Sequence, residues 1–410
     1  MSNRGFLEKL LDGAAVEWLP LGEVTQYEQP TKYLVKSTSY DEKFNIPVLT
    51  AGKTFILGYT DETSGIFEAS KFPTIIFDDF TTANKWVDFD FKAKSSAMKM
   101  ITASDDRRFS IKYVYHWLNT LPSGLVDGDH KRQWISNYCN KLVPIPCPED
   151  PEKSLTIQAE IVRILDSFTE LTAELTAELT AELNARKQQY NHYRHQLLSF
   201  EDGVVEWKTL GDVSLKSYSG GTPKAGSPKY YDGGTIPWLR TQEVVFSDIH
   251  ETAVKVTQAA LDETATKWVP EDCVIIAISG ATAGRSGINK IPLTTNQHCC
   301  CLEIDPQQAL YRYVFHWVSM NYEKLRDLGQ GARGDLNSGI IKGFNIPIPF
   351  PNDPDKSLAE QARIVTILDK FDTLTTSLSE GLPREIKLRQ QQYEYYRDLL
   401  LSFPKPEEAA

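Results

Sequence analysis

The chain has 410 residues, of which 41% are hydrophobic and 24% are charged, and its net charge is -11 at pH 7. This composition predicts a soluble chain of two or three domains, and no apolar run approaches the ~18 residues that a membrane span requires. The acidic balance argues against a protein that grips nucleic acid unaided, because phosphate contacts need basic side chains. Residues 1–12 do not resemble a signal peptide, so we expect a cytoplasmic protein without a membrane partner.

An internal repeat organises the chain into two copies of one unit. The motif Val16-Glu17-Trp18 returns as Val205-Glu206-Trp207, and further matching segments follow in the same order. These segments are 112–117 with 312–317, 145–155 with 348–358, 161–168 with 364–371, and 188–200 with 391–403. Each copy is predicted to contain a globular region, a proline-rich hinge and a long helix. The predicted domains are residues 1–150, 151–203, 204–352 and 353–410.

The helical segments match better than the globular regions, which share a framework and differ in their loops. This pattern indicates one scaffold that carries two different readers. The alternative is a duplicated domain whose loops drifted without a function. That alternative does not explain why both helical segments keep the same length and the same leucine pattern.

In the first globular region, residues 72–77 and 97–101 are predicted to be buried strands, and residues 113–118 a helix with an aromatic face. Residues 78–86 are predicted to form a polar loop with aromatic side chains. The one dense basic cluster lies at residues 130–134, where Lys and Arg stand beside Gln and Trp. That mixture suits phosphate contact and base readout, although a solvated turn is the alternative.

The central helix is predicted over residues 155–200, because residues 171–183 contain the tetrapeptide Thr-Ala-Glu-Leu three times without Gly or Pro. Such a helix would be about 70 Å long at ~1.5 Å per residue. The alternative is a long core helix in a single large domain. Leucines at i, i+4 spacing lie on one side of the helix and recur in the second copy. The two ladders, predicted to pair the helices, are Leu171, Leu175, Leu179 and Leu183, and Leu374, Leu378, Leu382 and Ile386. Gly381-Leu382-Pro383 interrupts the second ladder, and its proline predicts a kink or break there.

The second globular region has a different set of loops. Residues 219–223 and 230–241 are rich in glycine, which permits tight turns and close approach to a ligand. Residues 272–277 are predicted to form a buried strand. Residues 280–286 superficially resemble a phosphate loop, but only three residues separate the glycines and no lysine-bearing helix follows. Residues 330–337 are predicted to form a flexible, partly basic loop, in the place that residues 130–134 occupy in the first copy.

No catalytic or metal-binding group of residues stands out in the sequence. Cys299, Cys300 and Cys301 are adjacent, and neighbours on a strand point to opposite faces, which disfavours tetrahedral zinc. Reduced, partly buried thiols are expected instead. His116 and His316 occupy equivalent helix positions beside aromatic residues and are expected to be structural. The motif that amino-methyltransferases use to hold the target amine is missing, as is a nucleotide fingerprint.

The order of these features resembles the specificity subunit of type I DNA restriction-modification systems. The resemblance covers essentially the whole chain. It is carried by the Gly220–Trp238 run, the Ile-Pro hinges and the paired Gln-Gln-Tyr helix ends, and the Thr-Ala-Glu-Leu repeats resemble the type IC subfamily.

The resemblance implies a non-catalytic chain that supplies DNA recognition to a larger complex. Two methylation subunits carrying S-adenosylmethionine would methylate adenine in double-stranded DNA. Two motor-nuclease subunits, using ATP and Mg, would complete the ATP-dependent restriction endonuclease. No cofactor is expected in this chain. The acidic charge then has an explanation, because the methylation subunits can contribute positive charge around the DNA.

We therefore expect an α+β fold in which two mixed α/β target-recognition domains are separated by two long antiparallel coiled-coil helices, with a pseudo-twofold internal repeat. Each domain would read one half of a bipartite, asymmetric target. Arg suits guanine edges, Gln suits adenine and Lys more often holds phosphate. The residues expected to contact DNA are Lys85, Lys131, Arg132, Gln133, Lys224, Arg240, Gln242, Arg285 and Arg333. The rival interpretations are a coiled-coil scaffold that binds no DNA and a stand-alone methyltransferase.

Overall fold

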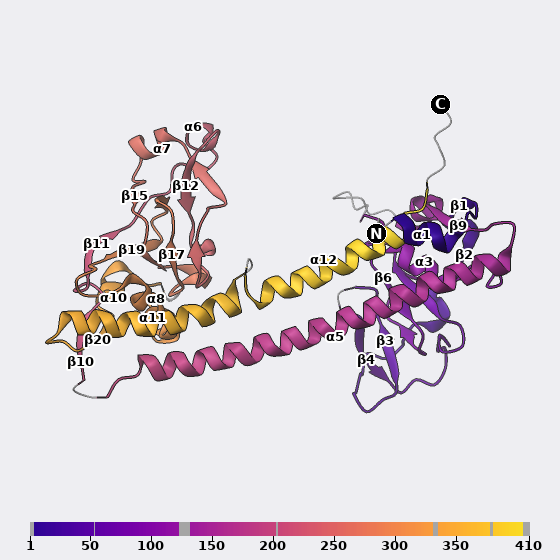
Figure 1. Ribbon diagram of the computed structural model, residues 1–410, viewed down its shortest axis with the longest axis horizontal. Coiled ribbons are helices and arrows are strands. Elements are labelled where there is room, and N and C mark those ends of the chain that lie inside the picture. The colour runs from indigo at the N-terminus through magenta and orange to yellow at the C-terminus, as the bar shows by residue number, and fades with distance from the viewer. Residues whose placement is uncertain are drawn as a thin grey trace. The chain divides into compact units, whose positions relative to one another are not determined.

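The computed structural model describes residues 4–52, 54–122, 132–201, 204–330, 335–377 and 380–404, with side chains described from residue 7 onward. The chain forms two compact units: unit 1 is Met1–Ala177 with Lys387–Ala410, and unit 2 is Glu178–Ile386. Each unit combines one globular region with parts of two long helical segments (Figure 1). The unit boundaries therefore lie inside helices: unit 1 is completed by the distant segment Lys387–Ala410, and unit 2 is continuous and includes the second part of α5.

Unit 1 begins with a short helix and continues through a series of short strands to a long helix. Its elements are, in chain order, α1 (Arg4–Leu11), β1 (Val16–Pro20), α2 (Leu21–Val24), β2 (Thr25–Glu28), η1 (Pro30–Tyr33), β3 (Ile46–Leu49), β4 (Ile56–Thr60), β5 (Thr74–Asp78), β6 (Asn84–Val87), β7 (Lys92–Ala93), β8 (Met98–Ala103), α3 (Ile111–Leu118), α4 (Gln133–Ser136), η2 (Tyr138–Asn140) and β9 (Leu142–Pro146). The long helix α5 (Pro151–Leu198) begins in unit 1 and ends in unit 2.

Unit 2 continues the chain with a larger set of short strands. Its elements are β10 (Val205–Thr209), β11 (Ser214–Tyr218), α6 (Pro228–Tyr231), β12 (Ile236–Leu239), η3 (Thr241–Glu243), β13 (Asp248–Ile249), β14 (Val254–Val256), α7 (Gln258–Glu263), β15 (Trp268–Val269), β16 (Val274–Ala277), η4 (Gly280–Thr282), β17 (Ser286–Asn289), β18 (Leu293–Thr295), β19 (Cys299–Ile304), α8 (Tyr311–Met320), α9 (Tyr322–Asp327), α10 (Ser338–Lys342), β20 (Asn345–Pro349) and α11 (Pro354–Thr376). The last helix, α12 (Leu382–Leu400), begins in unit 2 and ends in unit 1.

The globular region of unit 1 is built on two sheets. One has the order β2-β8-β5-β6 and the other the order β4-β3-β7. Helix α3 packs on β5 and β6, and one apolar core joins Ile75 and Phe77 of the sheet, Tyr113 of α3 and Ile161 of α5. This core holds the reading sheet, which we define as β2-β8-β5-β6, against the long helix. The predicted strands at 72–77 and 97–101 and the predicted helix at 113–118 correspond to β5, β8 and α3.

Unit 2 repeats this plan with more strands. Its sheets have the orders β11-β19-β16-β17-β13 and β14-β12-β18-β15. Helix α8 packs on β16 and β17 on one side and on α11 on the other. The main core joins Val274 of β16, Tyr313 of α8 and Leu368 of α11, so the helix is again held against the sheet through the same arrangement of elements.

The repeated motifs form the framework that the two units share. β1 pairs antiparallel with β9, with Val16 opposite Pro146, and β10 pairs antiparallel with β20, with Val205 opposite Pro349. The Tyr113 hydroxyl donates to the Pro144 carbonyl (2.6 Å), and the Tyr313 hydroxyl donates to the Pro347 carbonyl (2.8 Å). The Val-Glu-Trp and Ile-Pro motifs therefore recur because they close the same two-stranded ribbon in each unit.

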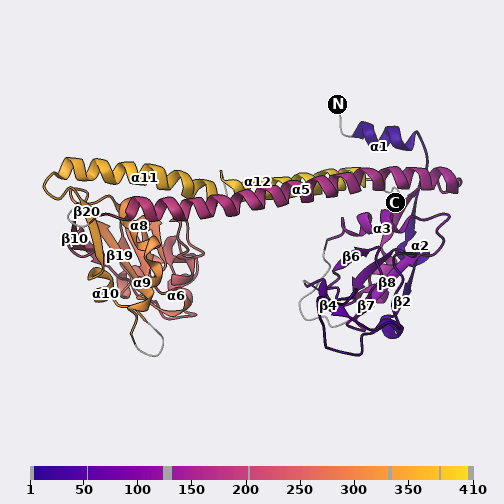
Figure 2. The same ribbon diagram turned by 90° about the horizontal axis from the view of Figure 1, so that it is seen from below.

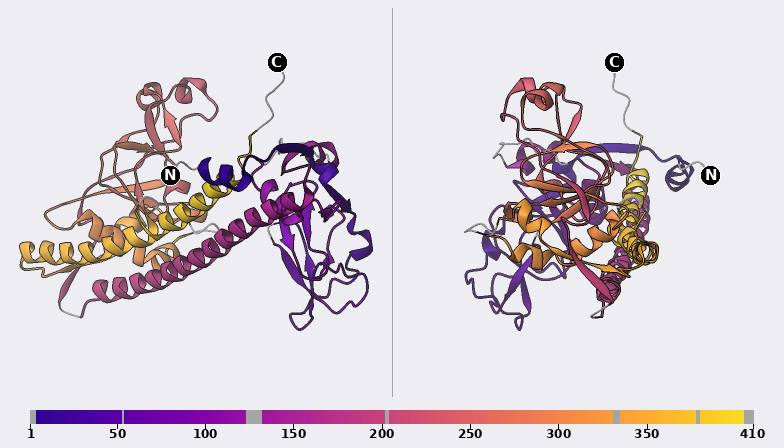
Figure 3. Two further views of the ribbon diagram at one scale, coloured as in Figure 1. Left: turned by 45° about the vertical axis from the view of Figure 1, so that its right-hand side comes forward. Right: turned by 90° about the vertical axis from the view of Figure 1, so that its left-hand side faces the viewer.

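The long helical segments agree with the expectation in one case and depart from it in the other. α5 is a single helix of 48 residues, shown in magenta in Figures 2 and 3. The second segment is two helices, because α11 ends at Thr376 and α12 begins at Leu382. A Cβ at Gly381 would lie 2.5 Å from the Thr373 carbonyl oxygen, so only glycine fits this turn. The predicted break at residues 381–383 is confirmed, and the expectation of two uninterrupted helices needs that correction.

Aromatic side chains pack the helical segments together within each unit. In unit 1, the rings of Phe168 and Tyr396 stack with their centroids 5.5 Å apart, and the Tyr393 hydroxyl lies 3.0 Å from Thr169 Oγ1. In unit 2, Phe371 stacks on Tyr193 at 5.5 Å. Of the two leucine ladders, Leu171 is exposed, Leu378 lies outside the described residues and the others are half-buried. Their pairing remains a prediction.

A charged pair in the smaller sheet of unit 1 makes a pH-dependent contribution. Lys92 Nζ lies 2.8 Å from the Glu62 carboxylate, which also accepts hydrogen bonds from the amides of Lys36 and Ser37. The hydrogen bond from Lys92 is the main cause that lowers the pKa of Glu62 to about 2, from an ordinary 4.5. A carboxyl with a lowered pKa stabilises the fold above its unfolded value and loses that contribution as the pH falls towards 2.

We expect wild-type protein to lose about 1–2 kcal/mol more unfolding free energy than Glu62→Gln between pH 5 and pH 2.5, because solvent screens part of this pair. Urea unfolding at both pH values measures the difference. Equal losses in the two proteins would show that this pair does not contribute.

Candidate nucleic-acid interface

The basic cluster of the first region is divided between surface and interior. Arg132 is exposed and directly precedes α4, whereas Gln133 is buried, with 5% of its surface accessible. The Gln133 amide donates to the Asp79 carbonyl (2.8 Å), and the Trp134 amide donates to the Asp79 carboxylate (3.0 Å). Lys131 lies outside the described residues. Arg132 is thus presented to solvent by a short helix whose start is fixed to Asp79, and Gln133 serves the packing of that helix in this structure.

A buried ion pair holds Asp79 in place. Lys99 Nζ of β8 lies 3.0 Å from Asp79 Oδ2, and both side chains are fully buried. The ammonium group also lies 5.1 Å from the centre of the Tyr27 ring. A buried carboxylate without its cation is strongly unfavourable, so Lys99 stabilises Asp79 beneath α4. No local sequence pattern predicts this pair, because Asp79 belongs to a predicted polar loop and Lys99 to a predicted buried strand.

Lys85 lies on the same sheet, close to the end of β5 that leads to Asp79. It is exposed on β6 and stands opposite Ile76 of β5. The predicted loop at 78–86 is therefore partly wrong, because its last three residues, from Asn84 on, begin this strand. Sheet pairing places Lys85 opposite Ile76 of β5, and the Asp79 contacts place Arg132 just beyond the end of the same strand, so β5 helps to position both exposed cations.

In the second region, two glycine-rich loops converge on a turn that the sequence does not single out. The Thr222 hydroxyl donates to Gln297 Oε1 (2.6 Å), and Ser279 Oγ lies 2.9 Å from His298 Nδ1. Gln297 Nε2 lies 3.1 Å from His298 Nε2. A Cβ at Gly220 would lie 1.8 Å from the Thr295 carbonyl, so glycine is required for this close approach. Gln297 and His298 are exposed, with their polar atoms held in a fixed arrangement.

The predicted contacts Lys224 and Arg285 flank this turn. Lys224 is exposed and follows the Thr222 loop, and Arg285 is half-buried at the end of the Ser279 loop, where its carbonyl accepts from the Ala277 amide (2.9 Å). Arg333 lies outside the described residues. The chain that follows it is anchored beside the Ser279 loop, because Leu336 donates its amide to the Ile278 carbonyl (2.8 Å).

Arg240 and Gln242 reach the same place from β12. Leu239 pairs with Thr295 of β18, and the Asn296 amide donates to the Leu239 carbonyl (3.2 Å). Arg240 is half-buried and its Nε lies 3.4 Å from the Glu243 carboxylate, whereas Gln242 is exposed. The structure therefore joins residues from four segments into one surface. We call it the second reading surface, and its members are Thr222, Lys224, Arg240, Gln242, Arg285, Gln297 and His298.

The chemistry of these surfaces suits recognition of nucleic acid. Exposed Arg, Lys and Gln side chains can contact phosphates and base edges in a DNA groove. Within the described part of the chain, no group of three or more His, Cys, Asp or Glu side chains is arranged to hold a metal ion. Cys299, Cys300 and Cys301 are buried on β19, and burial raises the pKa of the Cys299 thiol to about 12, which makes it a poor nucleophile.

The two equivalent histidines have structural partners, as expected. His116 Nε2 lies 2.9 Å from the Asp166 carboxylate, and His316 Nε2 lies 2.6 Å from the Asp369 carboxylate. Both carboxylates belong to long helices, so each histidine ties a globular region to its helix. Burial is the main cause that lowers the pKa of His116.

The helices in the described ranges include none that is both long and apolar enough to cross a membrane. Residues 204–388 match the family described as type I restriction modification DNA specificity domain. This match covers the second region, in which the second reading surface lies.

The similarity to known proteins extends along the chain. It is 56% identical over 413 residues to the EcoR124I/EcoR124II specificity subunit of the type I restriction enzyme of Escherichia coli, covering 99% of each chain. A solved S subunit of a type I restriction-modification system from M. genitalium is 15% identical, with a TM-score of 0.52 and coverage of 96% of this chain and 98% of that one. A chain from a solved type I R-M system gives a TM-score of 0.60 at 15% identity, covering 94% and 97%. The two solved structures show the same fold, and the sequence identity places the chain in the family of type I restriction-modification specificity subunits.

Proposed function

We propose that each globular region reads one half of a bipartite, asymmetric DNA target. The observation that carries this proposal is a shared framework with two different reading surfaces. The β1–β9 and β10–β20 ribbons are alike, whereas the exposed side chains differ: Lys85 and Arg132 in the first region, and Lys224, Gln242 and Gln297 in the second. Two different surfaces on one framework suit two different half-sites.

The specificity subunit has no catalytic role by itself and supplies sequence recognition to its complex. We infer that two methylation subunits with S-adenosylmethionine act on adenine in the double-stranded target. Two motor-nuclease subunits with ATP and Mg would add restriction. The net charge of -11 supports this assignment of functions to different subunits, because the subunits that enclose the DNA can supply the positive charge that this chain lacks. Such a complex would act in the cytoplasm, where the DNA is.

The test separates the two readers. We expect Lys131→Ala with Arg132→Ala to reduce base preference at one half-site about tenfold, because good side-chain contacts to bases discriminate by about that factor. Gln242→Ala is the matched variant in the other region and should reduce preference at the other half-site alone. Selection from random DNA, with the chain assembled with its methylation subunits, measures both.

Mapping of methylated adenines in cells that express the system gives an independent measurement of the wild-type target. A loss of preference in both half-sites with either variant would contradict separate readers. If selection with the wild-type complex enriches no DNA sequence, the result would favour the alternative of a coiled-coil scaffold that binds no DNA.

A further inference from the structure

A cation occupies the second position of the equivalent helices α3 and α8. In unit 1 it is Lys112 and in unit 2 it is Arg312. Each cation lies between a carboxylate of a long helix and a strand of the globular region. We call these groups the first clamp (Lys112, Asp166 and Trp86) and the second clamp (Arg312, Asp369 and Asp248).

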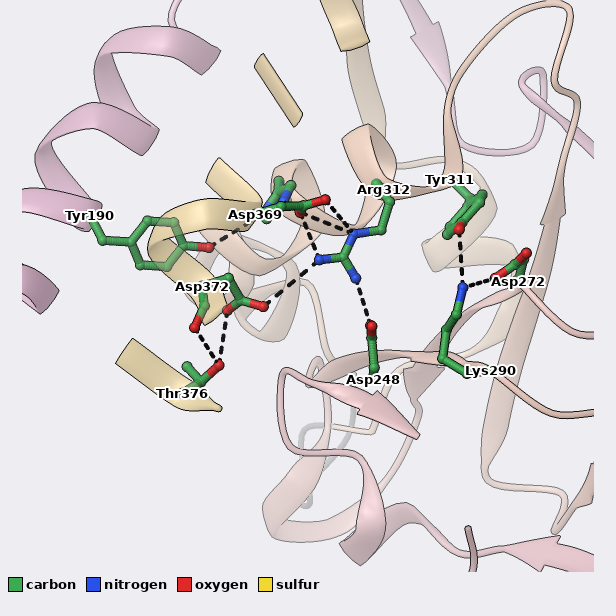
Figure 4. Close-up of polar contacts among 10 residues, drawn as sticks. Tyr190, Asp248, Asp272, Lys290, Tyr311, Arg312, Asp369, Asp372 and Thr376 are labelled. Atoms are coloured by element: carbon green, nitrogen blue, oxygen red, sulfur yellow. Dashed lines mark hydrogen bonds and ion pairs between the residues drawn. The ribbon is translucent and has the colours of Figure 1, made fainter. Parts of the chain in front are cut away.

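The second clamp is made of ion pairs with good hydrogen-bond geometry. Arg312 Nη2 lies 2.6 Å and Nε 3.0 Å from Asp369 Oδ1 on α11. Arg312 Nη1 lies 2.6 Å from Asp248 Oδ1 at the start of β13. The close-up shows the guanidinium group lying between these two carboxylates (Figure 4). The arginine side chain is 16% exposed, so solvent competes little for these bonds.

Further polar contacts surround Arg312 on the helix side. His316 Nε2 is bonded to Asp369, and the Tyr190 hydroxyl of α5 lies 3.3 Å from His316 Nδ1. Burial opposes ionisation of Asp369, but hydrogen bonds from His316 and then Arg312 outweigh it and lower the pKa of that carboxyl. Asp372 lies 3.9 Å from Arg312, and burial raises its pKa. The second clamp is therefore bonded to α11 through Asp369, and His316 and Tyr190 connect it to the part of α5 in unit 2.

Through Asp248 of β13, the second clamp is also connected to the second reading surface. Asp248 begins β13, and Gln242 lies six residues before it in the chain. The segment between them is fixed to β17, because the Phe246 amide donates to the Ser286 carbonyl (2.8 Å). Beside Arg312, the Tyr311 hydroxyl lies 3.1 Å from Lys290 at the end of β17 (Figure 4). The start of α8 thus connects the strands that carry the readers to the helix α11.

The first clamp has the same plan and weaker bonds. Lys112 Nζ lies 3.0 Å from Asp166 Oδ2 of α5 and 4.9 Å from the centre of the Trp86 ring. Trp86 adjoins the exposed Lys85 on β6. A lysine over a ring gives a weaker and less directional contact than an arginine shared by two carboxylates. The partners are also more exposed, at 30% for Lys112 and 38% for Asp166.

We propose that Lys112 and Arg312 are positioning residues that fix the reading strands to the long helices, and that the second clamp sets how strictly the spacer between half-sites is measured. This inference rests on the proposed function. If the second globular region is rigidly connected to the long helix, binding a half-site at the wrong spacing requires an unfavourable distortion. If the connection is flexible, the region can also bind a half-site that is displaced by one base pair.

The test is Asp248→Ala. This variant removes the ion pair between Arg312 and β13 and leaves Arg312 paired with Asp369 and Asp372. The complex with methylation subunits is given DNA with the preferred spacer and with spacers one pair longer or shorter. We expect spacer selectivity, the ratio of methylation rates, to fall about tenfold, because a hydrogen-bonded charge pair contributes about that factor. The bases of both half-sites should not change. Arg312→Lys, which loses the planar fork and keeps the charge, should act in the same direction.

Two matched variants serve as controls. Asp327→Ala removes an exposed ion pair with Arg326 in the same region, and Lys112→Arg keeps the charge of the first clamp. Neither should lower spacer selectivity. If Asp248→Ala slows methylation equally at every spacer, or alters the bases of the second half-site, the clamp only stabilises the region and the inference is overturned. If wild type itself shows no bipartite target, it is the proposed function that fails.

Discussion

Lys99→Ala should lower the unfolding free energy of unit 1 by about 3–5 kcal/mol, because it leaves the Asp79 carboxylate buried without its cation. The pair is fully buried, with 3.0 Å between Lys99 Nζ and Asp79 Oδ2. Asp79 also accepts the Trp134 amide beneath Arg132, so the loop that presents Arg132 should loosen with it. Readout of the first half-site should be lost together with stability.

Urea unfolding of the full chain measures this effect, and one of two transitions should move to lower urea, because the chain has two compact units. Lys85→Ala is the matched control, since it removes an exposed lysine from the same sheet. The double variant Lys99→Met with Asp79→Asn should recover part of the lost stability, since it removes both buried charges and keeps a side-chain oxygen for the Trp134 amide. A change below about 1 kcal/mol in Lys99→Ala would contradict the assignment.

Local patterns in the sequence were enough to predict the elements of the framework. β5 is an apolar run bounded by polar residues, β8 is mostly apolar apart from Lys99 and Thr102, and α5 is an uninterrupted run of helix-forming residues. The break after Thr376 follows from Gly381 and Pro383, because proline at the start of α12 cannot continue a preceding helix. These features depend on neighbours in the chain, which a sequence displays directly.

The candidate sites depend on contacts between distant segments, and much of them could not be predicted. Thr222, Ser279 and Gln297 meet only because strand pairing folds their loops together. Gln133 has the side chain expected of an adenine reader, yet it is buried. No local sequence pattern predicts the meeting of these loops or the burial of Gln133. Both depend on packing and strand pairing with segments that are distant in the chain. The expected contacts that the structure leaves exposed are Lys85, Arg132, Lys224 and Gln242.

The division of the long helices between the two units could not be predicted from local sequence patterns. Unit 1 is completed by Lys387–Ala410, and Trp18 of β1 donates its indole N–H to the Pro404 carbonyl (2.8 Å). Leu400 and Phe403 lie in the same core as Ile161 of α5. The repeat indicates two equal units, but only the packing shows that each unit borrows a helix from the other copy.

Deleting Thr176-Ala177-Glu178-Leu179 should shorten the spacer of the DNA target by one base pair and leave both half-sites unchanged. The deletion removes one Thr-Ala-Glu-Leu repeat from the middle of α5, at the boundary between the units, and no reading residue lies near it in the chain. Four residues correspond to ~6 Å of helix and to ~40° beyond a full turn. One base pair rises by ~3.4 Å and turns by about 35°, at ~10–10.5 pairs per turn.

The rotation matches one base pair, and the excess rise has to be absorbed elsewhere. Residues 377–381 between α11 and α12 are not helical in the described part of that segment, so the second connection between the units can change length there without breaking a helix. Methylation mapping with the deletion variant measures the spacer directly. A control that replaces the same four residues with alanines keeps the helix length and should keep the wild-type spacer. An unchanged spacer in the deletion variant, or altered half-site bases, would show that the repeats serve helix packing alone.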